Sequence, residues 1–237
     1  MADPLEAFPD DWTTALAVVA HPDDMEYGAA SAVARWTSEG KDVRYVLVTK
    51  GEAGIETMPP EQVGPLRMEE QRQSCAVVGV DDVSFLDHPD GLVVADVVLR
   101  ADLAEVIRHH RPDIVIATNY RDSWGGPSWN HCDHRAVGRA LLDAVRDAAN
   151  PWLFTDRGDP WGGVRFAAFS GSPSSTHGVD ITAHLDAGIE SLRKHAVYLE
   201  NLGGDMSDAG DFLRSNAEIH GQAMGVALAT TFEIVFV

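Results

Sequence analysis

The chain has 237 residues, of which 45% are hydrophobic and 23% are charged, and these proportions are typical of globular proteins rather than of fibrous or disordered ones. Lys and Arg number 18 while Asp and Glu number 37, so that the formal net charge is −19. A field of this sign repels phosphate backbones and anionic membrane surfaces, and we therefore expect no nucleic-acid partner.

The N-terminus and the cysteines indicate the cellular compartment. Residues 1–6 are acidic where a signal peptide would be basic, and the apolar run that follows is too short for a signal core or a membrane span. The two cysteines, Cys75 and Cys132, are too few for a disulfide framework and are interpreted as free thiols of a reducing compartment. We expect a cytoplasmic protein without membrane insertion.

Apolar runs alternate with helix-like segments along the chain. The predicted strands are short and rich in apolar residues, and the predicted helices show apolar residues at helical spacing or runs of strong helix formers. The predicted strands cover residues 14–20, 43–49, 82–87, 114–118, 164–170, 179–181 and 230–237. The predicted helices cover residues 28–38, 66–78, 94–110, 133–149 and 185–202, and polar loops are predicted at 59–65 and 119–132.

This alternation predicts an α/β fold with a mostly parallel sheet and helices on both faces, because right-handed crossovers return each strand beside its predecessor. No linker rich in Pro, Gly and Ser divides the chain, so a single domain over residues 1–237 is expected. The loops that follow parallel strands open at one edge of the sheet, which is where α/β enzymes place their active sites.

The first of these loops holds a crowded group of polar residues. His21, Asp23 and Asp24 directly follow the strand predicted at 14–20, which places an imidazole and two carboxylates at the carboxyl edge of the sheet. Such side chains supply metal ligands and a general base within reach of one another. Alone, a His-x-x-Asp pattern is more often a helix cap or a surface pair, so a site requires partners from another segment.

A second polar group, residues 131–134, lies on the same edge because it follows the fourth predicted strand. If His134 joins His21 and Asp24, the set of two imidazoles and one carboxylate suits Zn²⁺, with Fe²⁺ or Co²⁺ as other metals, and leaves one position open for water. An open position indicates a catalytic rather than a structural metal. The sequence therefore predicts a hydrolytic metal site.

The remaining polar residues of the two groups have predicted roles in the chemistry. Asp23 flanks a predicted ligand without needing to bind the metal, and we expect it to act as the general base. His131 is then free to face the developing oxyanion as an imidazolium. Asp133 is expected to hold His131 in that charged form.

The motifs His21-Pro22-Asp23-Asp24 and His131-x-Asp133-His134 resemble the two signature motifs of the PIG-L (LmbE-like) family of zinc-dependent N-deacetylases. Further matching pieces are Thr49-x-Gly51-Glu52-x-Gly54, Arg67 with Glu70, Phe85-Leu86-Asp87, and Pro89-Asp90-Gly91. The resemblance covers about residues 14–202. That family includes the deacetylases of N-acetylglucosaminyl phosphatidylinositol and of the mycothiol and bacillithiol precursors.

The resemblance implies a Rossmann-like sheet and the same assignment of roles. It implies His21, Asp24 and His134 as zinc ligands, Asp23 as the base and His131 as the oxyanion stabiliser. It also implies that Arg67 and Asp90 face the polar groups of the substrate.

The sequence departs from the family pattern at three positions. Met25 stands where the family commonly has an acid, and Glu26, one residue later, receives no role. Cys132 stands where proline is frequent, and its thiolate is a minor alternative zinc ligand. Trp129 stands where some members place a catalytic tyrosine. Of the histidines outside the motifs, only His195 has a claim to the rim of the pocket.

We therefore expect a zinc-dependent hydrolase that removes an N-acetyl or other N-acyl group from a small amino sugar or glycoconjugate by attack of an activated water. Two alternatives stay open. One is an amidase acting on a thiol conjugate or on an acylated natural-product intermediate, and the other is a metal-binding module without activity. The sequence also leaves open a homo-oligomer.

Overall fold

The computed structural model describes residues 5–202 and 208–237 of the chain. The strands are β1 (Glu6–Ala7), β2 (Thr14–Val19), β3 (Asp42–Leu47), β4 (Val83–Phe85), β5 (Ile114–Thr118), β6 (Ser123–Gly125), β7 (Ser128–Trp129), β8 (Phe166–Ser170), β9 (His177–Asp180) and β10 (Ala229–Phe236). The helices are α1 (Asp24–Gly28), α2 (Ala30–Ser38), α3 (Pro60–Val77), α4 (Val97–His110), α5 (Cys132–Ala149), α6 (Leu185–Arg193), α7 (Ala196–Asn201) and α8 (Ala209–Met224).

The central feature is an eight-stranded sheet in the order β1-β9-β10-β8-β5-β2-β3-β4. Strands β4, β3, β2, β5 and β8 are parallel, whereas β10 runs antiparallel to both β8 and β9. The predicted α/β class and mostly parallel sheet are therefore confirmed. The chain builds outward from β2 to β4 on one side and from β5 to β8 on the other, so the strand order reverses between β2 and β5. Such a reversal opens a crevice at the carboxyl ends of the two strands.

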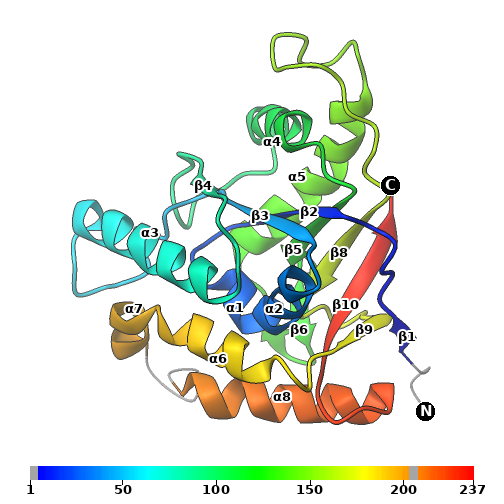
Figure 1. Cartoon of the computed structure of the whole chain (residues 1–237). Helices are drawn as coiled ribbons and strands as arrows, with labels where there is room; N and C mark the ends of the chain where they lie inside the picture. Colours follow the sequence, from blue (N-terminus) through cyan, green and yellow to red (C-terminus); the bar gives the residue numbers. More distant parts are fainter. Residues whose placement is uncertain (1–4, 203–207) are drawn as a thin grey trace.

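Helices cover both faces of the sheet, as Figure 1 shows, with α4 and α5 on one side and α2, α6 and α8 on the other. The alternation of side chains along β2 explains how one strand serves both layers. Ala15, Ala17 and Val19 pack in the cluster with α2, α6 and α8, while Leu16 and Val18 pack in the cluster with α4 and α5. A strand buried on both faces reads as a continuous apolar run, which is why β2 was recognisable in the sequence.

Two predicted elements begin earlier than expected. The first helix starts at Asp24 rather than at residue 28, as the short helix α1 followed by α2. Helix α3 starts at Pro60, inside the loop predicted at 59–65, because proline is well tolerated in the first turn of a helix. Pro65 also lies within α3, where it removes one backbone hydrogen bond without ending the helix.

Three further differences concern other segments of the chain. The loop predicted at 119–132 contains a small hairpin, formed by β6 and β7. The helix predicted at 185–202 is two helices, α6 and α7, separated at Lys194 and His195. Strand β1 and helix α8 were not predicted, since β1 has only two residues and α8 follows a stretch rich in Gly and Asp.

Candidate active site

A pocket of about 440 Å³ opens at the carboxyl ends of β2 and β5. Its walls come from the loops after β2, β3, β4 and β5 and from helices α1, α3, α5 and α7. The lining residues are His21, Asp23, Asp24, Tyr27, Ala53, Gly54, Arg67, Asp90, Gly91, Thr118, Trp124, His131, His134 and Tyr198. Seven of the eight residues predicted for the site are in this lining. The eighth, Asp133, is fully buried and contacts His21.

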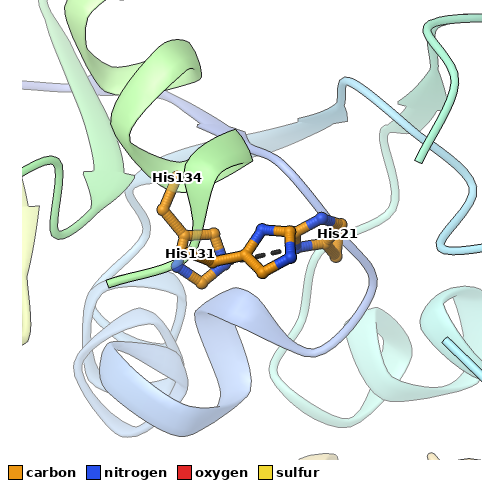
Figure 2. A group of neighbouring side chains, drawn as sticks. All are labelled: His21, His131 and His134. Atoms are coloured by element: carbon orange, nitrogen blue, oxygen red, sulfur yellow. Dashed lines mark hydrogen bonds between the residues drawn. The ribbon is translucent and has the colours of Figure 1, made fainter. Parts of the chain in front are cut away.

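The three predicted metal ligands converge in the pocket. His21 Nδ1 lies 3.2 Å from His134 Nε2, His134 Nε2 lies 2.9 Å from Asp24 Oδ1, and His21 Nδ1 lies 3.8 Å from Asp24 Oδ2. Figure 2 shows His21 and His134 facing each other, with His131 beside them. Tetrahedral zinc with ligand bonds of about 2.0–2.2 Å separates its ligand atoms by roughly 3.3–3.6 Å. The three observed separations, from 2.9 to 3.8 Å, lie on both sides of this range, so the side chains are close enough together to share one metal ion.

The outer nitrogens of both imidazoles are held by protein groups. His21 Nε2 lies 3.0 Å from Asp90 Oδ1 and 3.2 Å from Asp133 Oδ2, and His134 Nδ1 lies 3.0 Å from Asn130 Oδ1. When these outer nitrogens carry the protons, His21 Nδ1 and His134 Nε2 present lone pairs to the space between them. Histidines that bind metal are oriented in this way, by an acceptor on the far nitrogen.

The electrostatics of the cluster favour a positive charge at its centre. Burial disfavours a charged His21, yet its hydrogen bonds to Asp133, Asp24 and Asp90 prevail and hold its pKa well above the ordinary value. Burial likewise opposes the charge of Asp24, but His134 and His21 keep its pKa well below the usual range. Carboxylates gathered around two imidazoles in this way suit a bound cation.

Asp23 occupies a strained position beside the predicted ligands. Its backbone has φ 95° and ψ −18°, a left-handed conformation that costs a residue other than glycine about 1–3 kcal/mol. Gln71 Oε1 accepts a hydrogen bond from the Asp23 backbone N–H at 3.0 Å, and Arg67 donates to Asp23 Oδ2 at 3.1 Å. Burial raises the pKa of Asp23 to about 6 despite the opposing charge of Arg67.

Arg67 is 2% exposed and is held from several sides. Its guanidinium donates to the carbonyl oxygens of Gly51 and Pro22, and it stacks 4.0 Å from the centre of the Tyr198 ring. Gly51 has φ 63°, and a Cβ there would lie 2.3 Å from Arg67 Nη1. The glycine therefore permits both the backbone turn and the close approach of Arg67.

The structure changes the predicted relation between His131 and Asp133. The Asp133 carboxylate accepts from the backbone N–H groups of Gly91 and Val93 at 2.7 and 3.1 Å and contacts His21 Nε2. Its hydrogen bonds therefore orient His21, rather than hold His131 as was expected. His131 caps helix α5 instead, where its Nδ1 accepts from the Asp133 backbone N–H at 3.2 Å.

The pKa of His131 is lowered by burial and by the neighbouring His21 and His134, which is the opposite of the charged state expected from the sequence. In neutral His131 the accepting Nδ1 has no proton, so the proton resides on Nε2. The ring is then a neutral donor.

Several pocket residues were not found from the sequence. Tyr27, Trp124 and Tyr198 line the pocket, and the Trp124 ring lies 5.7 Å from the ring of His134. Trp124 lies in the polar loop predicted at 119–132, where it received no role from the sequence. Tyr198 carried no signal, because its segment reads as a continuous helix and only the break before α7 brings it over Arg67.

Three residues noted in the sequence lie outside the pocket lining. Trp129 is 68% exposed and stacks on Arg135, so its indole lies at the surface and not in the pocket. His195 is completely buried rather than at the rim. Cys132 is exposed, with its Sγ 3.4 Å from Asp133 Oδ1, and forms a candidate ligand group with His131 and Asp133.

Within the described residues, no helix combines the length and the apolar character that a membrane crossing requires.

The family model PIG-L, described as GlcNAc-PI de-N-acetylase, matches residues 16–145. This match covers more than half of the chain and includes both signature motifs. It confirms the resemblance seen in the sequence.

Two curated relatives are deacetylases of amino sugars. The 1D-myo-inositol 2-acetamido-2-deoxy-alpha-D-glucopyranoside deacetylase of Thermobifida fusca is 33% identical over 174 residues, which cover 62% of this chain and 58% of the relative. The diacetylchitobiose deacetylase of Thermococcus kodakarensis is 28% identical over 187 residues, which cover 76% of this chain and 68% of the relative. The chain thus spans little more than half of the length of the Thermobifida fusca relative.

A solved structure with the same fold is N,N'-diacetylchitobiose deacetylase from Pyrococcus horikoshii, complexed with its inhibitor MPG. It superposes with a TM-score of 0.85 and 24% sequence identity, over 95% of this chain and 84% of that one. The likeness extends beyond the matched family segment, to the strands and helices that follow residue 145.

Proposed function

Because this chain belongs to the PIG-L (GlcNAc-PI de-N-acetylase) family, we propose that it is a zinc-dependent hydrolase that removes the N-acetyl group from a small amino sugar or glycoconjugate. The observation that carries the proposal is the convergence of His21, Asp24 and His134 beside the carboxylate of Asp23 in one pocket. The amino-sugar substrates of the two curated relatives support the substrate class.

His21, Asp24 and His134 would hold the ion, which supplies a Lewis acid that polarises the acyl carbonyl and lowers the pKa of water to roughly 7. Asp23 lies next to these ligands and accepts a proton from the water that attacks the amide. The proton then passes to the departing nitrogen, so that water and the amide yield an amine and acetic acid.

His131 faces the same pocket and donates from Nε2 to the oxygen that gains negative charge in the transition state. This donation needs no imidazolium, because the Nδ1 atom accepts the helix N–H and fixes the tautomer. The Asp133 carboxylate and Asp90 Oδ1 hold His21 at Nε2. We assign Asp133 to orientation of a ligand rather than to the chemistry itself.

We propose that Arg67 and Asp90 border the sugar. Asp90 uses Oδ1 on His21 and Oδ2 on the Ala53 backbone N–H, and each oxygen retains a second lone pair for a substrate hydroxyl. The single domain, the cytoplasmic location and a homo-oligomeric state remain predictions from the sequence.

Purified protein tests the proposal directly. It should contain about one zinc ion per chain and release acetate from an N-acetylglucosaminide, and a chelator should abolish that release. A panel of N-acyl glucosamines with longer chains separates a deacetylase from a broader amidase. Zinc-loaded protein that is inert toward every acetamide in the panel would instead support a metal-binding module without activity.

A further inference from the structure

A layer of buried polar side chains adjoins Asp23 and lies outside the pocket lining. We name it the buried polar layer. It consists of Glu26, Gln71, Ser74, Ser191 and His195, each at most 1% exposed. The proposed chemistry uses none of these residues. The layer joins helices α1, α3 and α6 and the break before α7, so it connects segments that meet only in the folded protein.

Gln71 links this layer to Asp23. Its Oε1 accepts from the Asp23 backbone N–H at 3.0 Å, and its Nε2 donates to Glu26 Oε1 at 2.9 Å. The orientation of the amide is unambiguous, because a backbone N–H can only donate and an ionised carboxylate can only accept. Glu26 Oε1 also accepts from the Ser74 hydroxyl at 2.8 Å, so the Glu26 carboxylate is fixed in turn.

The Asp23 backbone needs such support. Its φ of 95° lies where residues other than glycine are rarely found, and a conformation of this kind persists only when its surroundings over-determine it. Gln71 holds the Asp23 main chain while Arg67 holds its side chain and the carbonyl of Pro22. The Gln71 contact fixes the peptide on the N-terminal side of Asp23, and that peptide sets the direction in which the carboxylate leaves the chain.

The buried polar layer contributes less to the stability of the fold than well-packed apolar side chains could. Glu26 Oε2 lies 3.7 Å from His195 Nε2, and both of these buried atoms lack a hydrogen-bond partner among the described residues. Apolar side chains of similar size often fill such a space with equal or better stability. Buried polar groups that are imperfectly satisfied occur preferentially where function requires a fixed geometry.

We propose that Gln71 is a positioning residue for the deacetylation, which couples the buried Glu26 carboxylate to the Asp23 main chain and so aims the Asp23 carboxylate into the pocket. This inference rests on the proposed function, in which Asp23 is the base. It also gives a role to Glu26, which received none from the sequence.

The first test is Gln71→Met, which keeps the length of the side chain and removes its hydrogen bonds to Asp23, Glu26 and Cys75. We expect kcat for acetate release to fall about 10- to 100-fold, because small displacements of a catalytic group have effects of this order, with KM changed less than about threefold and zinc content unchanged. Gln73→Met is the matched control, since Gln73 lies on the same helix and donates to the exposed Glu69. It should retain wild-type kcat.

A reciprocal exchange supplies the rescue. Gln71→Glu alone places its carboxylate against that of Glu26 and should lose activity. When Gln71→Glu is combined with Glu26→Gln, the carboxylate at position 71 can accept from the Asp23 N–H, and the amide at position 26 can donate to position 71. The double variant should recover most of the lost kcat. A Gln71→Met variant with wild-type kcat, or a double variant no better than Gln71→Glu, would overturn the proposal. So would a loss of kcat that follows loss of zinc.

If Gln71→Met does not fold, the double variant and Gln71→Glu decide the question, because both keep a polar side chain at the position. A crystal structure of Gln71→Met or Gln71→Glu tests the positioning without any assay. Asp23 should leave the left-handed region in the variant and remain there in Gln73→Met. If the wild-type protein is inactive on the whole substrate panel, the proposed function is refuted. The positioning of Asp23 by Gln71 still holds in that case if the variant structure shows the change in the Asp23 backbone.

Discussion

The two segments that build the pocket differ in how deeply they are set into the protein. In the segment after β2, His21, Asp23 and Asp24 are all less than 10% exposed, and hydrogen bonds from α3 and from the loop after β4 hold them. In the segment that begins α5, the cap residue His131 and the first helical residue Cys132 are exposed. The first segment is a fixed part of the core, while the second presents groups to an incoming substrate. Substitutions in the two should therefore have different consequences.

Replacement of His21 by alanine should have the largest effect, because it removes a predicted ligand and leaves three carboxylates without their shared donor. We expect loss of bound zinc and a fall in acetate release of about 10⁴-fold or more, since the metal carries several kcal/mol of transition-state stabilisation. Elemental analysis and the acetate assay measure the two effects. His177→Ala, in strand β9 and outside the pocket lining, is the control and should keep both metal and activity.

Asp23→Asn should separate chemistry from metal binding within the same buried segment. The amide cannot accept a proton, and we expect kcat to fall about 10³-fold, while zinc content stays near one per chain. Turnover at the wild-type rate would mean that Asp23 is not the base. If the variant loses both zinc and turnover, metal binding and proton transfer cannot be separated in the segment after β2.

His131→Ala should be milder than either change, because it removes one donor from the exposed segment. We expect kcat to fall about 10²-fold, with metal content and the thermal unfolding midpoint close to wild type. Steady-state kinetics and a thermal melt measure these quantities. A large loss of stability would show that the helix cap, and not the donor, dominates the role of His131.

The smallest effects should distinguish two tryptophans of the β6–β7 hairpin. Trp124→Ala should raise KM about 2- to 10-fold, because an aromatic wall of the pocket contributes about 0.5–1.5 kcal/mol. Trp129→Ala should change KM less than about twofold, because its ring lies at the surface over Arg135. The structure places Trp124 in the wall of the pocket and Trp129 outside it. Equal effects of the two substitutions on KM would contradict this placement.

The sequence predicted the convergence of the two segments for a physical reason. Strands β2 and β5 are parallel neighbours, so the residues that follow them must open on the same edge of the sheet. The apolar run at 114–118 coincides with strand β5. The amino-acid sequence alone therefore sufficed to place His21 and His134 together, and their separation of 3.2 Å agrees with that expectation.

The partners of individual side chains were less predictable. Asp133 was paired with His131 because the two are close in sequence, but helix α5 begins at Cys132 and turns the Asp133 carboxylate inward to His21. Similarly, residues 185–202 read as one helix. Glu70 accepts from the Val197 backbone N–H at 2.7 Å and so caps the second helix from outside its own segment. Such choices depend on contacts between distant segments, which local sequence patterns do not contain.

The spacing of the predicted ligands along the chain has a consequence for folding. His21 and His134 are 113 residues apart, so an ion that joins them closes a long loop between β2 and β5, as a removable cross-link would. Binding to the native state alone adds stability in proportion to the logarithm of the free metal concentration, about 2.7 kcal/mol when that concentration is 100 times the Kd. Chelation should therefore lower the unfolding midpoint of the wild-type protein while leaving that of His21→Ala nearly unchanged, so the same ion would govern both turnover and the stability of the fold.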